Sequence, residues 1–145
     1  MHFKSADDAA GDWYMDAGIN QKEFDSLHLA KWSPKLIVMA HIVALALQND
    51  EKTLIYSKDL KTLDIIELFL CQRDWKEQID SLRPFKEKLG GWMKGRDFLR
   101  IDGSVDSGRR GDLVDDFNCS EDTKAFLISS LAGGIGINLV SKHAF

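Results

Sequence analysis

The residues best suited to chemistry lie near the C-terminal end, in the run FLISSLAGGIGINL at 126–139. An apolar stretch typical of a buried strand leads into two serines and then into a turn with three glycines. A strand that enters a helix through a glycine-rich turn brings backbone N–H groups close to a phosphate. The glycine spacing alone is weak, because Leu139 stands where a dinucleotide fingerprint needs its third glycine. A ligand loop and an ordinary strand-to-helix turn both remain open on this pattern.

Other segments predict the elements that would position this turn. The β-branched and aromatic run at 53–56 and the apolar run at 98–101 are typical of strands in a parallel sheet. Between them, Leu60, Leu63, Ile66 and Leu70 form one apolar helical face. This order implies a βαβ unit, with parallel strands at about 52–57, 98–101 and 124–129. Ser33-Pro34 and Ser107 are the predicted starts of two further helices.

Four blocks together carry a family resemblance. The first two are KTLIYSK at 52–58 and LDIIELFL at 63–70. The third combines FLRIDGS at 98–104, Arg110 and VDDFN at 114–118, and the fourth is the glycine-rich run. In order and spacing they resemble the second motor lobe of Swi/Snf-type (Snf2 family) ATP-dependent chromatin remodellers, which are superfamily 2 helicase-like translocases. The resemblance covers residues 52–140. The long segment at 72–97, ending in WMKGRD, is similar to the ATRX-like branch.

The resemblance implies an α/β fold of the RecA-like (P-loop NTPase-type) kind, a helicase C-terminal lobe with a mainly parallel sheet. We expect an acidic connector or tail at 1–31 and a partial lobe at 32–145, with an insert at about 72–97. We also expect the lobe to be truncated at its C-terminal end, because the sequence stops at Phe145 before the QxxGR block that holds the family's arginine finger.

The resemblance also implies site residues. Gly134, Gly136 and Asn138 correspond to positions that meet ATP, with Asn138 at the ribose. The positions expected to contact DNA phosphates without reading sequence are Ser57, Lys58, Ser104, Arg110, Ser129 and Ser130. For Arg110 an internal ion pair is favoured over a phosphate contact, and the two serines after the last strand could equally cap the next helix. No catalytic residue and no metal ligand is assigned to this chain.

Two features limit the expected activity. Leu131 replaces the cation of the family's STRAGG block, which removes one contact to the DNA backbone. The sequence also has neither a P-loop nor a DEAH-like run, so magnesium would be held by the first RecA-like lobe. The run GGWMKGRD at 90–97 has P-loop spacing, but Arg96 replaces the lysine and Asp97 replaces the hydroxyl. This chain alone is therefore expected to lack ATPase activity.

Composition restricts the class of protein. With 145 residues, 44% hydrophobic and 29% charged, the chain is long enough for one globular domain and shows no disorder bias. The net charge of −4 excludes a generally basic nucleic-acid binder, although basic residues are locally in excess between 84 and 110. No signal peptide is visible, and the longest apolar run, at 36–47, is too short to span a bilayer. We expect a nuclear protein with no membrane contact.

Three function classes follow. The first is the second lobe of a DNA translocase or chromatin remodeller, whose partners would be DNA, the first lobe of the same motor and nucleosomes. The second is a non-catalytic interaction or regulatory module that keeps the lobe fold, which Leu131 and the missing first lobe favour. The third is a stand-alone Rossmann domain, which the absent third glycine disfavours.

Overall fold

The computed structural model describes residues 29–73 and 75–130. Its elements alternate between helices and strands, as the sequence predicts for an α/β fold. In chain order they are α3 (Leu29–Trp32), α4 (Pro34–Gln48), β1 (Thr53–Ser57), α5 (Leu60–Cys71), α6 (Trp75–Gln78), the 3₁₀ helix η2 (Asp80–Leu82), β2 (Phe98–Ile101), α7 (Ser107–Cys119) and β3 (Ala125–Ser129).

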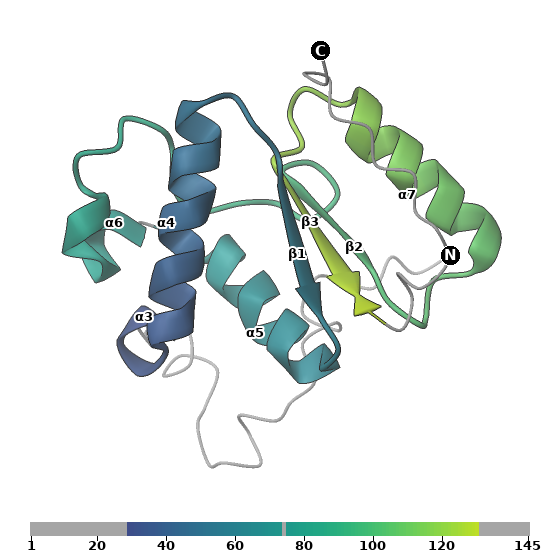
Figure 1. Cartoon of the computed structure of the whole chain (residues 1–145), viewed down its shortest axis with the longest axis horizontal. Coiled ribbons are helices and arrows are strands. Elements are labelled where there is room, and N and C mark those ends of the chain that lie inside the picture. Colours follow the sequence, from purple (N-terminus) through teal and green to yellow (C-terminus); the bar gives the residue numbers. More distant parts are fainter. Residues whose placement is uncertain (1–28, 74, 131–145) are drawn as a thin grey trace.

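The three strands form one parallel sheet in the order β1-β3-β2 (Figure 1). The register aligns Thr53 with Ala125 and Ser57 with Ser129 on one side of β3, and Ile101 with Ile128 on the other. Every residue of the central strand β3 is buried, which explains its continuous apolar composition. The predicted topology is confirmed, and each strand lies within one residue of its predicted range.

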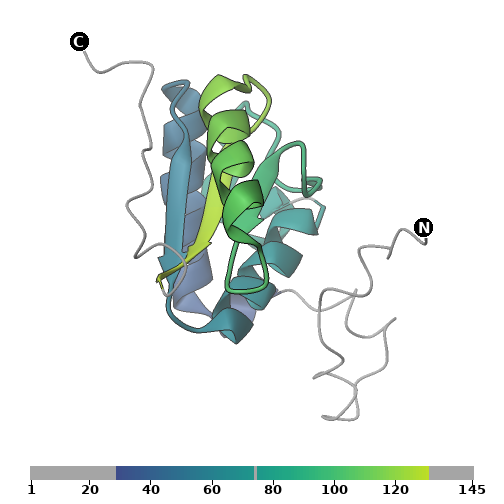
Figure 2. The same cartoon turned by 90° about the vertical axis from the view of Figure 1, so that its right-hand side faces the viewer.

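Helices cover both faces of the sheet (Figure 2). The first crossover connects β1 to β2, which are not neighbours in the sheet. The second crossover connects β2 to β3, which lies between them. Because both crossovers are right-handed by the general rule and run in opposite directions, α5 and α7 lie on opposite faces. One core joins α4 and α5 to Phe98, Ala125 and Leu127. The other joins α7 to the opposite face, through Leu99, Ile101, Val114, Phe117, Phe126 and Ile128.

Side chains fix the helix ends. Ser33 accepts from the Leu36 N–H at 3.4 Å and caps α4, with Pro34 at the first helical position, as predicted. Asp59 caps α5 by accepting from the Thr62 N–H at 3.0 Å. The predicted cap of α7 is corrected by one residue: Asp106 accepts from the N–H of Gly108, and Ser107 begins the helix.

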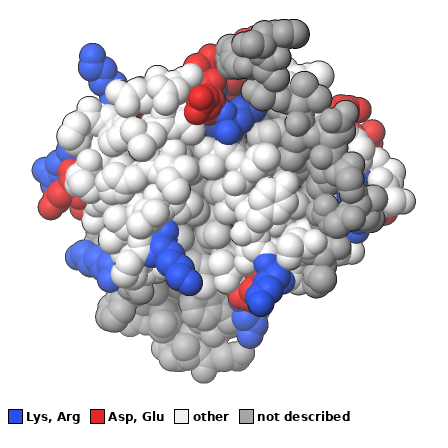
Figure 3. Space-filling view, in the orientation of Figure 1, with Lys and Arg blue, Asp and Glu red and all other residues white. Residues whose placement is uncertain are grey.

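Apolar side chains remain exposed along one side of the molecule. Val38, Ile42 and Leu45 follow one face of α4, with 60%, 54% and 51% of their surface exposed. Leu54 and Tyr56 of β1 lie on the face that α7 covers only over β2 and β3. Figure 3, in which β1 lies toward the viewer, shows a broad central area without charged side chains.

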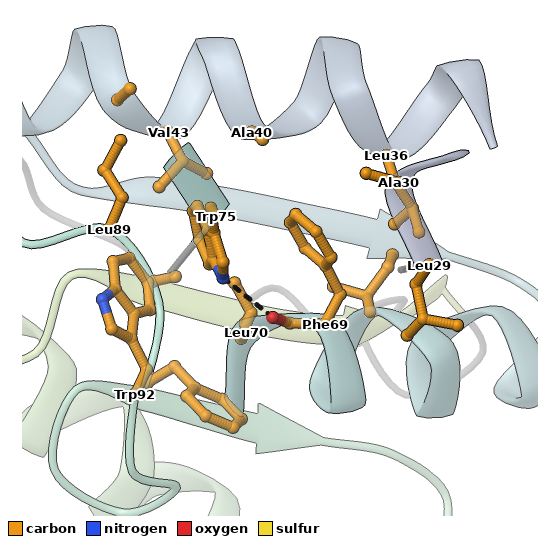
Figure 4. Packing of buried hydrophobic residues seen from close by; sticks show 14 of the residues in the cluster. Leu29, Ala30, Leu36, Ala40, Val43, Phe69, Leu70, Trp75, Leu89 and Trp92 are labelled. Atoms are coloured by element: carbon orange, nitrogen blue, oxygen red, sulfur yellow. Dashed lines mark hydrogen bonds between the residues drawn. The ribbon is translucent and has the colours of Figure 1, made fainter. Parts of the chain in front are cut away.

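The segment between α5 and β2, where the sequence predicts an insert, contributes buried side chains to the core. Trp75, which is fully buried, stacks on Phe69 with ring centroids 4.8 Å apart and donates from Nε1 to the Phe69 carbonyl at 2.9 Å (Figure 4). Trp92 packs against Trp75 at 5.4 Å. Further buried side chains of this segment are Ile79, Leu82 and Leu89.

Candidate nucleic-acid interface

The loops that carry the predicted DNA contacts lie at one edge of the sheet. Ser57 is the last residue of β1 and pairs with Ser129, the last residue of β3. Ser104 follows the end of β2 by three residues. Because the carboxyl ends of parallel strands meet at one edge, the ends of β1, β2 and β3 are neighbours at the lower end of the sheet in Figure 1. Open α/β sheets bind ligands at this edge.

The loop after β1 offers an exposed lysine on a rigid turn. The Ser57 hydroxyl donates to the Asp59 carbonyl at 3.1 Å and accepts from the Asp59 N–H at 3.2 Å. This turn places Asp59 at the cap of α5. The Lys58 side chain is exposed, and no other described residue forms a hydrogen bond or ion pair with it. Of the two predicted contacts here, Lys58 is the one free to reach a phosphate.

The loop after β2 is held from within by Asp102. Its Oδ1 accepts from the Ser104 N–H at 3.0 Å and from the Ser104 hydroxyl at 2.5 Å. Burial of the Asp102 carboxyl favours its neutral form, but the hydrogen bonds from Ser104 and the charge of Arg100 outweigh burial, so its pKa lies below its ordinary value. Both donors of Ser104 are therefore engaged, and a phosphate would have to replace Asp102 as the acceptor of one of them.

Arg110 serves the same loop from α7. Its Nε donates to the Val105 carbonyl at 2.8 Å, so it ties the first turns of α7 to the end of the DGS turn. The sequence favoured a structural role through an ion pair. Within the described residues the structural contact is a hydrogen bond to the backbone instead.

Ser129, the last residue of β3, and Ser130, which follows it, differ in accessibility. Ser129 is fully buried, and its hydroxyl has no hydrogen-bond partner among the described residues. It follows Ala125 and Leu127 on the face that α5 covers. Ser130 is exposed. A phosphate at this edge would therefore meet the Ser130 hydroxyl first.

The predicted ATP contacts at Gly134, Gly136 and Asn138 lie outside the described residues, and so does Leu131. Across 29–73 and 75–130 no group of three or more His, Cys, Asp or Glu side chains could hold a metal ion. Within the same ranges no helix is long and apolar enough to cross a bilayer.

The sequence did not reveal the role of Arg100, whose side chain is 8% exposed beneath α5. Its Nη1 reaches Asp64 at 2.6 Å and Glu67 at 3.1 Å, and its Nε reaches Asp102 at 2.9 Å. Burial of the guanidinium opposes its charge, but the carboxylates outweigh burial and raise its pKa. The available signal was an arginine inside an otherwise apolar strand, with two acids one helical turn apart on the preceding helix.

No family model matches this sequence. The chain is 37% identical over 135 residues to Protein CHROMATIN REMODELING 20 of Arabidopsis thaliana, in an alignment that covers 91% of this chain and 8% of that protein. It is 34% identical to the Drosophila melanogaster Transcriptional regulator ATRX homolog (86% of this chain, 10% of that protein) and 32% identical to human Transcriptional regulator ATRX (92% and 5%). The chain thus spans about a tenth or less of these relatives.

Among solved structures, the C-terminal part of the Fun30 ATPase domain matches 66% of this chain and 24% of that chain, with 33% identity and a TM-score of 0.44. The sequence relatives, a chromatin remodelling protein and ATRX proteins, agree with the family resemblance, and the parallel sheet agrees with a RecA-like lobe. The chain therefore belongs to the Snf2 family of chromatin remodellers.

Proposed function

We propose that this chain acts as part of the second motor lobe of an ATP-dependent DNA translocase in chromatin. The observation that carries the proposal is the meeting of three strand ends at one edge of a parallel sheet, each followed or ended by a residue with a hydroxyl group or a lysine. Such loops suit phosphate contacts, which fix the position of the duplex without reading its bases. A translocase needs this kind of contact, because it must step over any sequence.

The residues divide by how readily they reach a phosphate. Lys58 and Ser130 are exposed and can reach a phosphate most readily. Ser57 and Ser104 are engaged within their own loops and would have to exchange a hydrogen bond, while Arg110 supports the loop of Ser104. Ser129 would contribute only if its covering moved, because its side chain is fully buried.

For ATP, the proposal assigns the ribose contact to Asn138, whose amide can donate and accept, and the close backbone approach to Gly134 and Gly136. Magnesium and the charge stabilisation of phosphoryl transfer would come from the first RecA-like lobe and from the family's arginine finger. In the intact protein, nucleosomes would be the substrate and the nucleus the location.

The test is a salt titration of binding to a short labelled duplex of arbitrary sequence, followed by fluorescence anisotropy. Since few charges lie at this edge, we expect a Kd of about 10⁻⁴ to 10⁻⁶ M that weakens with salt and is the same for unrelated sequences. Lys58→Ala should weaken binding and lower the salt slope by roughly one phosphate. The matched control is Lys86→Ala, which removes an exposed lysine in the segment between α5 and β2. This variant should leave the affinity and the salt slope unchanged.

Two further variants change residues that follow β3 in the sequence. Leu131→Arg restores the family cation and should tighten binding, with a salt slope steeper by roughly one phosphate. Ser130→Glu places a negative charge against the phosphate and should abolish binding. If Leu131→Arg and Lys58→Ala both leave affinity and salt slope unchanged in a folded chain, this edge does not face DNA.

A second candidate function is a non-catalytic interaction module, and the exposed apolar side of α4 and β1 favours it. Among the described residues nothing pairs with the outer edge of β1, and exposed edges with apolar side chains are prone to join another chain. Ile42→Lys and Tyr56→Lys should then abolish association with a protein partner or a second copy, measured by sedimentation, while Lys58→Ala has no effect.

A further inference from the structure

Arg100 is the centre of a nearly buried ion cluster that joins β2 to α5. It contacts three carboxylates, on Asp64, Glu67 and Asp102, and Glu67 also binds Lys94 at 2.8 Å. Two cations against three anions leave this cluster with one net negative charge. Removing Arg100 would therefore leave three carboxylates close together with only the more exposed Lys94 to offset them.

The two ends of the guanidinium serve different elements. Nη1 binds the α5 carboxylates, whereas Nε binds Oδ2 of Asp102. The remaining oxygen of Asp102, Oδ1, holds the backbone N–H and the hydroxyl of Ser104. A continuous chain of contacts therefore runs from α5 through Arg100 and Asp102 to Ser104. Because arginine donates from a rigid planar fork, these contacts fix the orientation of the Asp102 carboxylate and also balance its charge.

The same helix also defines the neighbouring loop. Asp59 caps α5 and exchanges hydrogen bonds with the Ser57 hydroxyl through its backbone. The loop after β1 and the DGS turn after β2 are therefore both attached to α5, one through its N-terminus and the other through Arg100. Their relative position depends on this one helix.

We propose that Arg100 is a positioning residue for nucleic-acid binding, which holds the DGS turn in place and neutralises Asp102 where a phosphate would approach. The inference rests on the proposed function of this edge. Asp102 lies within hydrogen-bond distance of Ser104, so a phosphate that reaches Ser104 also meets the Asp102 carboxylate. With Arg100 in place that carboxylate is paired, and without Arg100 it repels the phosphate.

A purely structural brace makes a different prediction. If Arg100 only stabilises the fold, loss of Arg100 changes stability, and Asp102→Asn gives no rescue of DNA affinity. If Arg100 neutralises Asp102, then Arg100→Gln weakens DNA binding by about 3- to 10-fold at low salt, the effect of about one charge. Adding Asp102→Asn should restore most of this affinity, because asparagine carries no charge and still accepts from Ser104.

The experiment measures duplex binding by anisotropy for the wild-type chain, Arg100→Gln, Asp102→Asn and the double variant. The matched control is Arg83→Gln, which removes an exposed arginine paired with Asp80 at 2.9 Å and should leave affinity unchanged. In parallel, hydrogen exchange of the Ser104 amide is followed by NMR without DNA. Arg100→Gln should speed the exchange of this amide. If the glutamine variant does not fold, Arg100→Lys keeps the charge but not the planar fork, so it should speed the exchange and leave most of the affinity, and a loss of affinity as large as that expected for the glutamine variant would overturn the role of the charge.

The outcomes separate the two claims. Normal affinity of folded Arg100→Gln, or a double variant that binds no better than Arg100→Gln, would overturn the role of Arg100 while the proposed function stands. If the wild-type chain does not bind DNA at low salt, the proposed function fails and the phosphate role of Arg100 falls with it. Faster Ser104 exchange in that case would leave Arg100 as a brace of the DGS turn alone.

Discussion

Replacing Gly90 by alanine would test whether the segment between α5 and β2 is part of the folding core. Gly90 has a φ of +92°, in the left-handed region. A Cβ built on it would lie 2.4 Å from the Gln72 carbonyl oxygen and 2.5 Å from Cδ1 of Trp75. Trp75 is fully buried and stacked on Phe69, so neither neighbour can move aside without disturbing the core.

The expected cost has two parts. The left-handed conformation costs a residue with a Cβ about 1–2 kcal/mol relative to glycine. Forcing a methyl group into a packed site costs about 1–3 kcal/mol more. Gly95→Ala is the matched control, because Gly95 has a φ of +86° and nothing within 4 Å of its added Cβ. The control should lose only the first part, whereas Gly90→Ala should lose about 2–5 kcal/mol.

Urea denaturation followed by far-ultraviolet circular dichroism measures both variants. We expect a lower midpoint for Gly90→Ala than for Gly95→Ala, with the same m-value if the transition stays two-state. Equal midpoints would refute the reasoning, because the overlap with Gln72 and Trp75 would then cost nothing. In that case the segment would pack loosely in solution and could be treated as an insert outside the core.

Three further results are expected. Lys52→Met removes the ammonium that donates to the carbonyls of Phe117 and Ser120 at the end of α7, and should lower the free energy of unfolding by about 1–3 kcal/mol in the same assay. The lowered pKa of Asp102 means that its contribution to stability is present above the unfolded pKa of about 3.9 and is lost as pH falls through the lower folded value. Asp102→Asn should therefore flatten the pH dependence of unfolding below about pH 4, and an unchanged slope would contradict the pKa shift. The purified chain should show no ATPase activity above background in a phosphate-release assay, with or without DNA. Magnesium-dependent turnover would refute the proposal that the first RecA-like lobe must supply the magnesium site.

The sheet could be predicted because its strands stand out in the sequence as apolar segments. In a parallel sheet covered on both faces, strands appear as short continuous apolar runs, and β3 has this composition at Ala125–Ile128. Because the apolar run is continuous, the sequence did not show that Ser129 is buried while Ser130 is exposed. With every residue of β3 buried, polarity does not alternate along the strand, so no pattern shows which hydroxyl faces the covering helix.

Long-range contacts were beyond the reach of local patterns. Arg100 and Asp64 are 36 positions apart, and their ion pair depends on how α5 crosses the sheet. The core role of Trp75 and Trp92 could not be predicted either, because Trp75 lies between charged residues, Trp92 follows two glycines, and no helical or strand period connects the two. Such residues pack through the tertiary fold, which a period of 2 or 3.6 does not report.

The accessibility of this edge bears on how a motor could use it. Of the predicted DNA contacts within the described residues, only Lys58 and Ser130 are both exposed and unengaged by other described residues. Ser104 is occupied by Asp102, so it can bind a phosphate only by giving up a hydrogen bond that already satisfies it. The net gain from such an exchange is small, which favours weak contacts that form and break readily. In the proposed function a translocating lobe must release its strand at each step, and an edge whose Ser104 donors exchanged between Asp102 and a phosphate would meet that requirement better than a cluster of free lysines.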